Sequence, residues 1–212
     1  CNLNLKRLTK YHIRTGEMRM TDLAIRQESN LMPALSMDEA PYRYNLVVEY
    51  TKKMMTQDKD YGVIPGTGKK PTLLKPGAEK LCSLFGMVPE FETISKIEDF
   101  EKGLFFYRVK CTLHRNGDPV ASGIGSCNSK EKKYRWRYVM EWDATDADKD
   151  NAVEVINFKA RNGKKYTKYK FENSDPFELV NTIDKMAQKR SLVAATLIAT
   201  NASEFFTQDI ED

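Results

Sequence analysis

Apolar side chains recur at helical spacing in three stretches of the chain and at every second position in the stretches between them. Intervals of three and four residues place such side chains on one side of a helix. Ser36 and Glu39 have the spacing of a capping box, Pro76 suits the first turn of a helix, and Asp175 suits an N-cap. The predicted helices cover residues 37–57, 76–85 and 176–202.

Alternating apolar and polar positions predict antiparallel strands between the second and third helices. The dipeptide Asn116-Gly117 joins two of them and is the strongest short signal for a hairpin. The predicted strands cover residues 88–97, 104–114, 119–127, 153–158 and 164–171. This order predicts an α+β fold, in which helices, including a long C-terminal one, pack on one face of an antiparallel β-meander of about four or five strands.

Length and composition fit a single globular domain. The chain has 212 residues, of which 41% are hydrophobic and 30% charged, and it contains no run of eighteen apolar residues that would span a membrane. We expect residues 1–35 to form a poorly ordered or non-native leader, residues 36–203 one α+β domain and residues 204–212 an acidic tail.

Two short stretches interleave aromatic rings with lysine and arginine. Residues 129–138 (SKEKKYRWRY) contain a single acid, and residues 159–170 (KARNGKKYTKYK) contain none. Cations neutralise phosphates and flat rings stack on unpaired bases, so the combination favours binding of single-stranded nucleic acid. The alternative is a half-exposed strand with rings inward and charges outward.

Further cations lie outside these stretches. Lys185, Lys189 and Arg190 share one side of the predicted C-terminal helix, either as phosphate contacts or as a solvated surface. Lys69 and Lys70 end a glycine-rich loop that resembles a phosphate-binding loop, although a plain turn is an equal alternative. Its spacing does not match a P-loop, and Lys70 stands where a Ser or Thr should hold magnesium, so ATP is not expected.

The sequence shows little catalytic or metal-binding chemistry. The four cysteines form no CxxC pair, and the chain has only two histidines, so we expect neither a zinc site nor a nucleophilic cysteine. Acids between residues 141 and 154 could bind Mg²⁺ as in a nuclease, but they suit a flexible, solvated loop better. We therefore expect a protein that is not an enzyme and has no cofactor, and reducing cytoplasm suits its cysteines.

Four groups of residues resemble a family of phage and prophage proteins, over most of residues 40–212. They are residues 61–67 (YGVIPGT), 71–82 (PTLLKPGAEKLC), 123–129 with 133–137 (GIGSCNS and KYRWR), and 185–190 with 206–209 (KMAQKR and FTQD). The layout, a short β-meander followed by a long helix with a Met-Ala-x-Lys-Arg-type segment, also resembles the RecT/Redβ/Erf superfamily of single-strand annealing proteins. Many members of the phage family carry a cysteine-rich insertion after the Tyr-Arg-Trp-Arg segment, where this chain is acidic.

The resemblance implies ATP-independent annealing of complementary single-stranded DNA during phage recombination in the cytoplasm of a bacterial host. It also implies an annealed duplex intermediate, a ring or filament of identical subunits, and a single-strand binding protein or an exonuclease as a partner. The alternatives are a single-strand binding protein that does not anneal, a Mg²⁺-dependent nuclease that uses Asp143, Asp146 and Asp148, and a phage factor that binds another protein.

The predicted nucleic-acid contacts are cations that bind phosphate, together with Tyr134 and Trp136, which would stack on bases or wedge between them. The complete set is Lys69, Lys70, Lys130, Lys132, Lys133, Tyr134, Arg135, Trp136, Arg137, Lys164, Lys165, Lys168, Lys185, Lys189 and Arg190.

Overall fold

A computed structural model describes residues 35–63, 70–161 and 163–207 of the chain. Residues 1–34 of the predicted leader, Lys69, and residues 208–212 of the predicted tail lie outside the described residues. The chain divides into two compact units, residues 1–45 and residues 46–212.

The predicted helices are present in the structure. Helix α2 (Glu39–Met54) begins with the expected capping box, in which Glu39 N donates to Ser36 Oγ and Ser36 N donates to Glu39 Oε2. Helix α3 is Lys75–Leu84. The long C-terminal helix α6 (Val180–Thr200) follows a 3-10 turn, η1 (Phe177–Leu179), and Asp175 accepts from Phe177 N as predicted.

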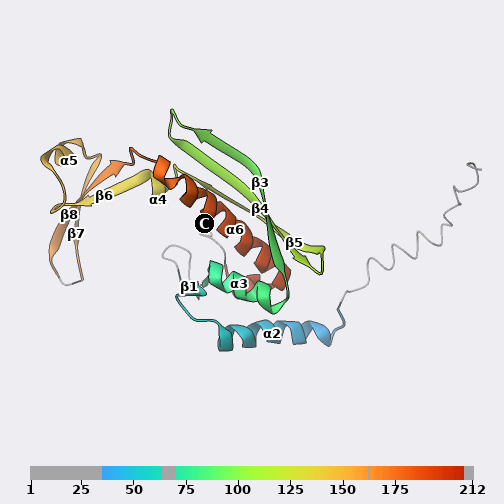
Figure 1. The fold of residues 1–212 in the computed structure, drawn as a ribbon. Helices are drawn as coiled ribbons and strands as arrows, with labels where there is room; N and C mark the ends of the chain where they lie inside the picture. The colour runs from blue at the N-terminus through green and yellow to red at the C-terminus, as the bar shows by residue number, and fades with distance from the viewer. Residues whose placement is uncertain (1–34, 64–69, 162, 208–212) are drawn as a thin grey trace, which may run out of the picture. The chain divides into compact units, whose positions relative to one another are not determined.

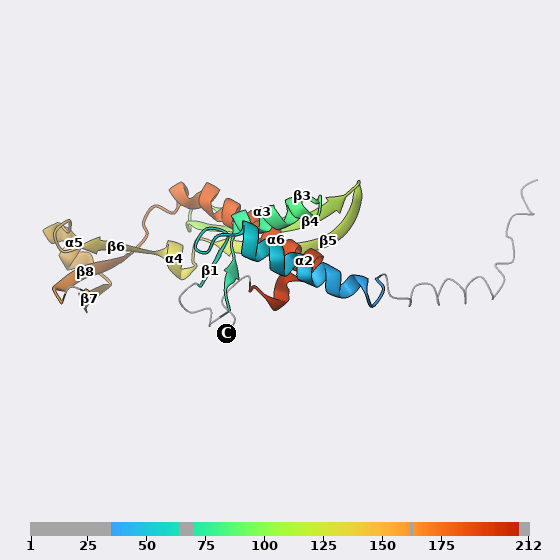
Figure 2. The same ribbon diagram turned by 90° about the horizontal axis from the view of Figure 1, so that it is seen from below.

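The central sheet of the domain is an antiparallel β-meander. Its strands β3 (Val88–Asp99), β4 (Leu104–Arg115) and β5 (Asp118–Asn128) lie in the order β3-β4-β5. Asn116 and Gly117 have φ angles of 55° and 90°, as the predicted tight hairpin requires. Helix α6 lies along β4 and β5 on one face of this sheet, and α3 packs against α6 (Figures 1 and 2). The predicted α+β fold is therefore confirmed.

The remaining strands do not extend the meander, in contrast to the predicted sheet of four or five strands. Strands β6 (Trp136–Met140), β7 (Glu154–Lys159) and β8 (Lys165–Glu172) form a separate antiparallel sheet in the order β6-β8-β7. A helical turn, α4 (Lys132–Arg135), separates β5 from β6 and redirects the chain. Two short strands, β1 (Tyr61–Gly62) and β2 (Thr72–Leu73), pair with each other.

Two segments are more ordered than expected: the predicted acidic loop and the start of the predicted acidic tail. The acidic segment after β6 contains a short helix, α5 (Asp146–Asn151), because Thr145 and Asp148 form a capping box. Residues 204–207 of the predicted tail pack on the domain: Phe206 is buried, and Thr207 exchanges backbone hydrogen bonds of 2.9 Å with Pro71 and Leu73. The folded part therefore continues to Thr207.

The sheet and α6 meet along a seam of small residues, which we call the glycine seam (Gly123 and Gly125 on β5; Ala187, Ser191, Ala194 and Ala195 on α6). A Cβ atom on Gly125 would lie 2.4 Å from Ser191 N and 2.5 Å from Ala187 O. A Cβ atom on Gly123 would lie 2.3 Å from Ala195 N. Since both obstacles are helix backbone, only glycine allows α6 to lie this close to β5.

No helix among the described residues is long and apolar enough to cross a membrane.

The glycine seam gives a direct stability prediction. Gly125→Ala should lower the free energy of unfolding by about 1–3 kcal/mol, because the new methyl group overpacks the sheet–helix contact. Urea denaturation would measure the change. Ser122→Ala, an exposed residue of the same strand, is the matched control and should stay within about 0.5 kcal/mol of the wild type. Equal stabilities for Gly125→Ala and the control would contradict the close contact.

Candidate nucleic-acid interface

One side of the β6-β8-β7 sheet combines rings and lysines; we call it the aromatic–lysine face (Trp136, Tyr138, Phe158, Tyr166, Lys168 and Lys170). The register places these side chains together, because residues directly opposite each other in a sheet share a face. Tyr138 pairs with Lys170, and Phe158 pairs with Tyr166. Lys168 and Lys170 therefore stand on the central strand between rings on both edge strands.

The rings and cations of the aromatic–lysine face are in mutual contact. Lys168 Nζ lies 4.6 Å from the ring centre of Tyr138 and 5.5 Å from that of Phe158. Lys170 Nζ lies 4.5 Å above Trp136 and 2.7 Å from Glu154 Oε2. Tyr138 and Phe158 are 42% and 36% exposed. Rings and lysines thus share one accessible surface, whereas the alternative interpretation expected the rings to point inward.

A second concentration of charge lies at α6; we call it the cation cluster (Lys75, Lys133 and Lys189). Lys189 is half-buried, and its pKa is lowered by burial first and then by the charges of Lys133, Arg190 and Lys75. The cluster joins residues from α3, α4 and α6, which are far apart in the sequence. A half-buried cation with further cations near it is a favourable place for an anion such as phosphate.

Two cavities follow each other along η1 and α6. The first, of about 470 Å³, runs between β3 and α6, and its lining combines three lysines and one acid with apolar side chains: Lys75, Lys185, Lys189, Glu79, Phe91, Met186 and Leu192 are among them. Lys75 and Glu79 form an ion pair of 3.4 Å. The second, also of about 470 Å³, is lined by Lys133, Trp136, Arg137 and Glu178, among others. Glu178, Thr182, Lys185 and Lys189 are spaced by four, three and four residues, so they share one helix side.

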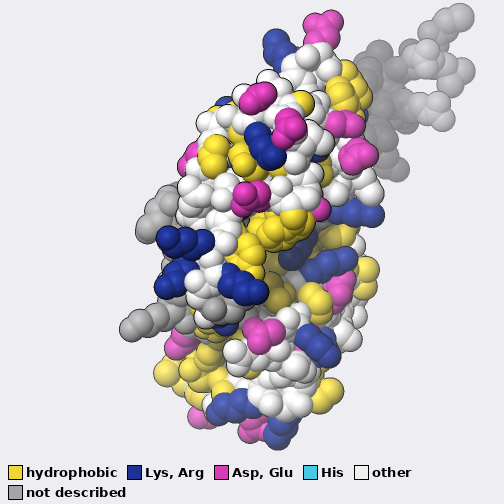
Figure 3. Space-filling model, turned by 90° about the vertical axis from the view of Figure 1, so that its left-hand side faces the viewer, with side chains coloured by type: hydrophobic (Ala, Val, Ile, Leu, Met, Phe, Trp, Pro, Cys, Tyr) yellow, Lys and Arg dark blue, Asp and Glu magenta, His cyan; other side chains and the backbone are white. Residues whose placement is uncertain are grey.

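Trp136 belongs to both the second cavity and the aromatic–lysine face. The two cavities have no lining residue in common, but the charge of Lys133 in the second acts on Lys189 in the first. We call the two cavities and this face together the α6 path. On the side of the molecule that carries this sheet, Lys and Arg side chains lie beside exposed hydrophobic side chains (Figure 3). The structure thus brings together Lys133, Trp136, Arg137, Lys168, Lys185 and Lys189 from the predicted set.

Tyr134 does not have the predicted role. It is 6% exposed and packs in a core cluster with Phe105 and Ile183, and burial raises its pKa to about 12. It therefore has no surface for stacking on a base. The reason is α4: this helical turn interrupts the alternation of the basic stretch and directs Tyr134 into the domain.

Arg190 forms a structural ion pair with Glu131. Its guanidinium group binds Glu131 in a bidentate ion pair of 2.7 and 3.0 Å, and it also donates to the carbonyl of Ser126. Burial raises the pKa of Glu131, but hydrogen bonding and the charge of Arg190 bring it below its usual value. Arg190 thus connects α6 to the segment just before α4.

The remaining predicted cations lie elsewhere. Lys130 and Arg135 flank Glu172, and Lys132 is exposed on α4. Lys164 and Lys165 are exposed at the turn between β7 and β8. Lys70 donates to the carbonyl of Ser203, and Lys69 lies outside the described residues.

The predicted set of nucleic-acid contacts does not include Lys75, Tyr138, Phe158, Tyr166 or Lys170. The sequence does mark Lys75 as unusual, because it lies in the first turn of α3, where the helix dipole disfavours a cation. In the structure this cation also pairs with Glu79 of the same helix at 3.4 Å. Phe158 carried no such signal, because its place beside Lys168 depends on the order of strands in the sheet.

The described residues show no group of three or more His, Cys, Asp or Glu side chains that could hold a metal ion. Cys82, Cys111 and Cys127 are free and buried. Burial raises the pKa of Cys111 to about 12 and that of Cys127 to about 11, so neither thiol is activated as a nucleophile.

Comparisons with protein-family models, curated proteins and solved structures gave no match to this chain.

Arg190 and its neighbour Lys189 should differ in their effects on stability. Arg190→Ala should lower the free energy of unfolding by about 1–3 kcal/mol, because it leaves the partly buried Glu131 carboxylate unpaired. Urea denaturation would measure this, with Lys132→Ala as the exposed control. A change below about 0.5 kcal/mol for Arg190→Ala would show that the ion pair is not structural.

Lys189→Met should instead raise the stability at neutral pH and low salt. The lowered pKa of Lys189 means that the folded state disfavours its charged form, so removing the charge removes a cost. The gain should shrink as salt screens Lys133 and Lys75. It should also shrink as the pH rises through the folded-state pKa of Lys189, because the wild-type lysine then becomes neutral in the folded protein. A gain that is independent of salt and pH would contradict the electrostatic cause.

Proposed function

We propose that this protein binds single-stranded DNA and anneals complementary strands without ATP. The observation that carries this proposal is the α6 path, in which lysines line a cavity beside α6 and lie in contact with partly exposed rings on the β6-β8-β7 sheet. The phage-family and superfamily resemblances favour the same activity.

The lysines of the α6 path would bind the phosphates of the strand. Lys75, Lys185 and Lys189 surround the cavity between β3 and α6. Glu79 also lines this cavity and pairs with Lys75 at 3.4 Å, so a bound phosphate would interact mainly with Lys185 and Lys189. It would offset the burial and the neighbouring positive charges that lower the pKa of Lys189. Phosphate contacts carry no sequence information, which suits a protein that must accept any strand.

The aromatic–lysine face would hold the bases. Tyr138 and Phe158 are partly exposed, and a base that stacks on one of these rings would replace the cation–π contact of Lys168. A sheet surface leaves the opposite side of each base stack open to solvent. Stacked bases whose pairing edges stay accessible can meet a second strand. This combination supports annealing, which requires no bond chemistry, whereas a site that encloses each base would only protect the strand.

We also propose an oligomeric assembly and a cellular location for the protein. The resemblance favours a ring or filament of identical subunits on DNA, in the bacterial cytoplasm, together with a single-strand binding protein or an exonuclease. Mass photometry with and without a long single strand would test the assembly. The second candidate function is single-strand binding without annealing, since the same surface would support it.

Annealing of two complementary labelled oligonucleotides without ATP tests the proposal. We expect the wild type to accelerate pairing, with an effect that falls as salt rises. Lys185→Ala/Lys189→Ala should weaken binding and reduce the magnitude of the salt slope by about 0.7 for each phosphate that the variant no longer neutralises. Trp136→Ala should weaken binding by about 1–3 kcal/mol for each base that stacks on the ring.

Arg108→Ala/Lys110→Ala is the matched control. It removes two cations from β4 on the side opposite α6, since both alternate with buried residues that face the helix. This variant should anneal like the wild type. Binding without acceleration would leave the second candidate function. An equal loss in the control and the α6 variant would show that net charge, not the α6 path, determines binding.

A further inference from the structure

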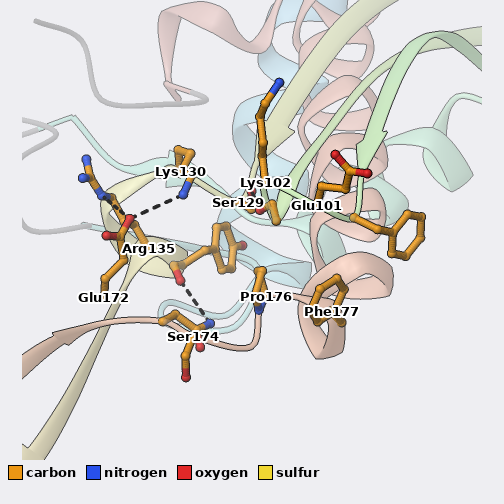
Figure 4. Close-up of a pocket in the computed structure, with 13 residues that line it drawn as sticks. Glu101, Lys102, Ser129, Lys130, Arg135, Glu172, Ser174, Pro176 and Phe177 are labelled. Carbon is orange, nitrogen blue, oxygen red and sulfur yellow. Dashed lines mark hydrogen bonds and ion pairs between the residues drawn. The ribbon is translucent and has the colours of Figure 1, made fainter.

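A smaller pocket lies next to the aromatic–lysine face and the second cavity, between three segments of the chain (Figure 4). They are the turn between β3 and β4, the segment from Ser129 to Arg135, and the link between β8 and η1. The cavity measures about 180 Å³. Pockets for whole drug-sized ligands start at about 300 Å³, so this one suits a smaller group.

The walls of the pocket are held by specific contacts. Ser129 is buried; its hydroxyl donates to the Gly103 carbonyl at 2.9 Å and accepts from Phe105 N at 3.0 Å. Gly103 has a φ of 59°, and a Cβ atom there would lie 2.7 Å from Pro176 Cγ. The β3–β4 turn is therefore fixed against the link that leads to η1.

Charged side chains line the pocket, and one carboxylate lies between two of its cations. Glu172 Oε1 is 3.4 Å from Lys130 Nζ and 3.2 Å from Arg135 Nε (Figure 4). Charge-assisted hydrogen bonds normally measure about 2.7–2.9 Å, so these contacts are loose. Lys102 adds a third cation, which pairs with Asp99 at 3.4 Å, and Glu101 adds a second acid.

The pocket also has an aromatic edge and a connection to the α6 path. Phe100 and Phe177 are stacked with ring centres 5.9 Å apart, and they are 63% and 45% exposed. The guanidinium of Arg135 lies 4.7 Å above the ring of Trp136, which belongs to the aromatic–lysine face. A strand that crosses Trp136 therefore reaches this pocket next.

We propose that the pocket binds the terminal phosphate monoester of a single strand, an inference that rests on the proposed function. A monoester carries a charge of about −1.5 to −2 and three acceptor oxygens, so it can take the place of the Glu172 carboxylate between Lys130 and Arg135. An internal phosphodiester has chain on both sides, whereas a cavity of only about 180 Å³ between three segments favours a chain end. The terminal base would lie against the exposed rings of Phe100 and Phe177.

Oligonucleotides of one sequence with a 5′-phosphate, a 3′-phosphate or only hydroxyl ends test the proposal by fluorescence anisotropy. We expect one phosphorylated form to bind the wild type about tenfold more tightly than the hydroxyl form, the effect of one hydrogen bond to a charged group. Glu172→Gln should increase this ratio, because it removes the competing charge. Lys130→Gln should bring the ratio of the two affinities to about one, because it removes a cation that binds the phosphate. Lys132→Gln, at the exposed neighbour, should leave the ratio at its wild-type value.

The ratio of affinities for phosphorylated and hydroxyl oligonucleotides tests the pocket independently of whether the protein anneals DNA. Equal affinities for all three oligonucleotides, together with normal annealing, would overturn the pocket alone. Absence of binding by any oligonucleotide at low salt would overturn both. An increased affinity of Glu172→Gln for all three forms with an unchanged ratio would show a general charge effect, and would also overturn the pocket.

Discussion

The contact of α6 with β5 at the glycine seam is the constraint on which the rest of the structure depends. Helix backbone lies where the Cβ atoms of Gly123 and Gly125 would be, so the two elements meet without side chains between them. Small residues on both sides make this approach possible. The helix is consequently fixed in both position and rotation relative to the sheet, and its sides have defined neighbours.

The seam determines which residues of the KMAQKR segment reach solvent and which do not. Ala187 lies against Gly125, which turns Arg190 towards Ser126 and Glu131 and turns Lys185 and Lys189 towards the cavity beside β3. Arg190 then ties α6 to the start of the segment that contains α4. The position of Lys133 and Trp136 relative to Lys189 therefore follows from a packing contact between small residues.

Local patterns predicted the elements well, and the tertiary environment decided the site. The capping box at Ser36, the hairpin at Asn116-Gly117 and the start of the last helix depend on a few neighbouring residues, and all three are present. The burial of Tyr134 and the pairing of Arg190 with Glu131 depend on partners far away in the chain. Alternation in the basic stretch could not show that four of its residues form a helical turn, because rings and cations at every second position also occur in a strand.

The cations of this domain fall into two groups: those paired with an acid, which stabilise the fold, and those near other cations, which do not. Arg190 is paired with Glu131, Lys80 with the buried Asp60, and Lys170 with Glu154. Lys189 is half-buried, and its pKa is lowered first by this burial and then by the charges of Lys133, Arg190 and Lys75. Folding alone gives no reason for a cation at that position, since an apolar residue would cost less there. An anionic ligand would give a reason, because it would offset the unfavourable charge of Lys189.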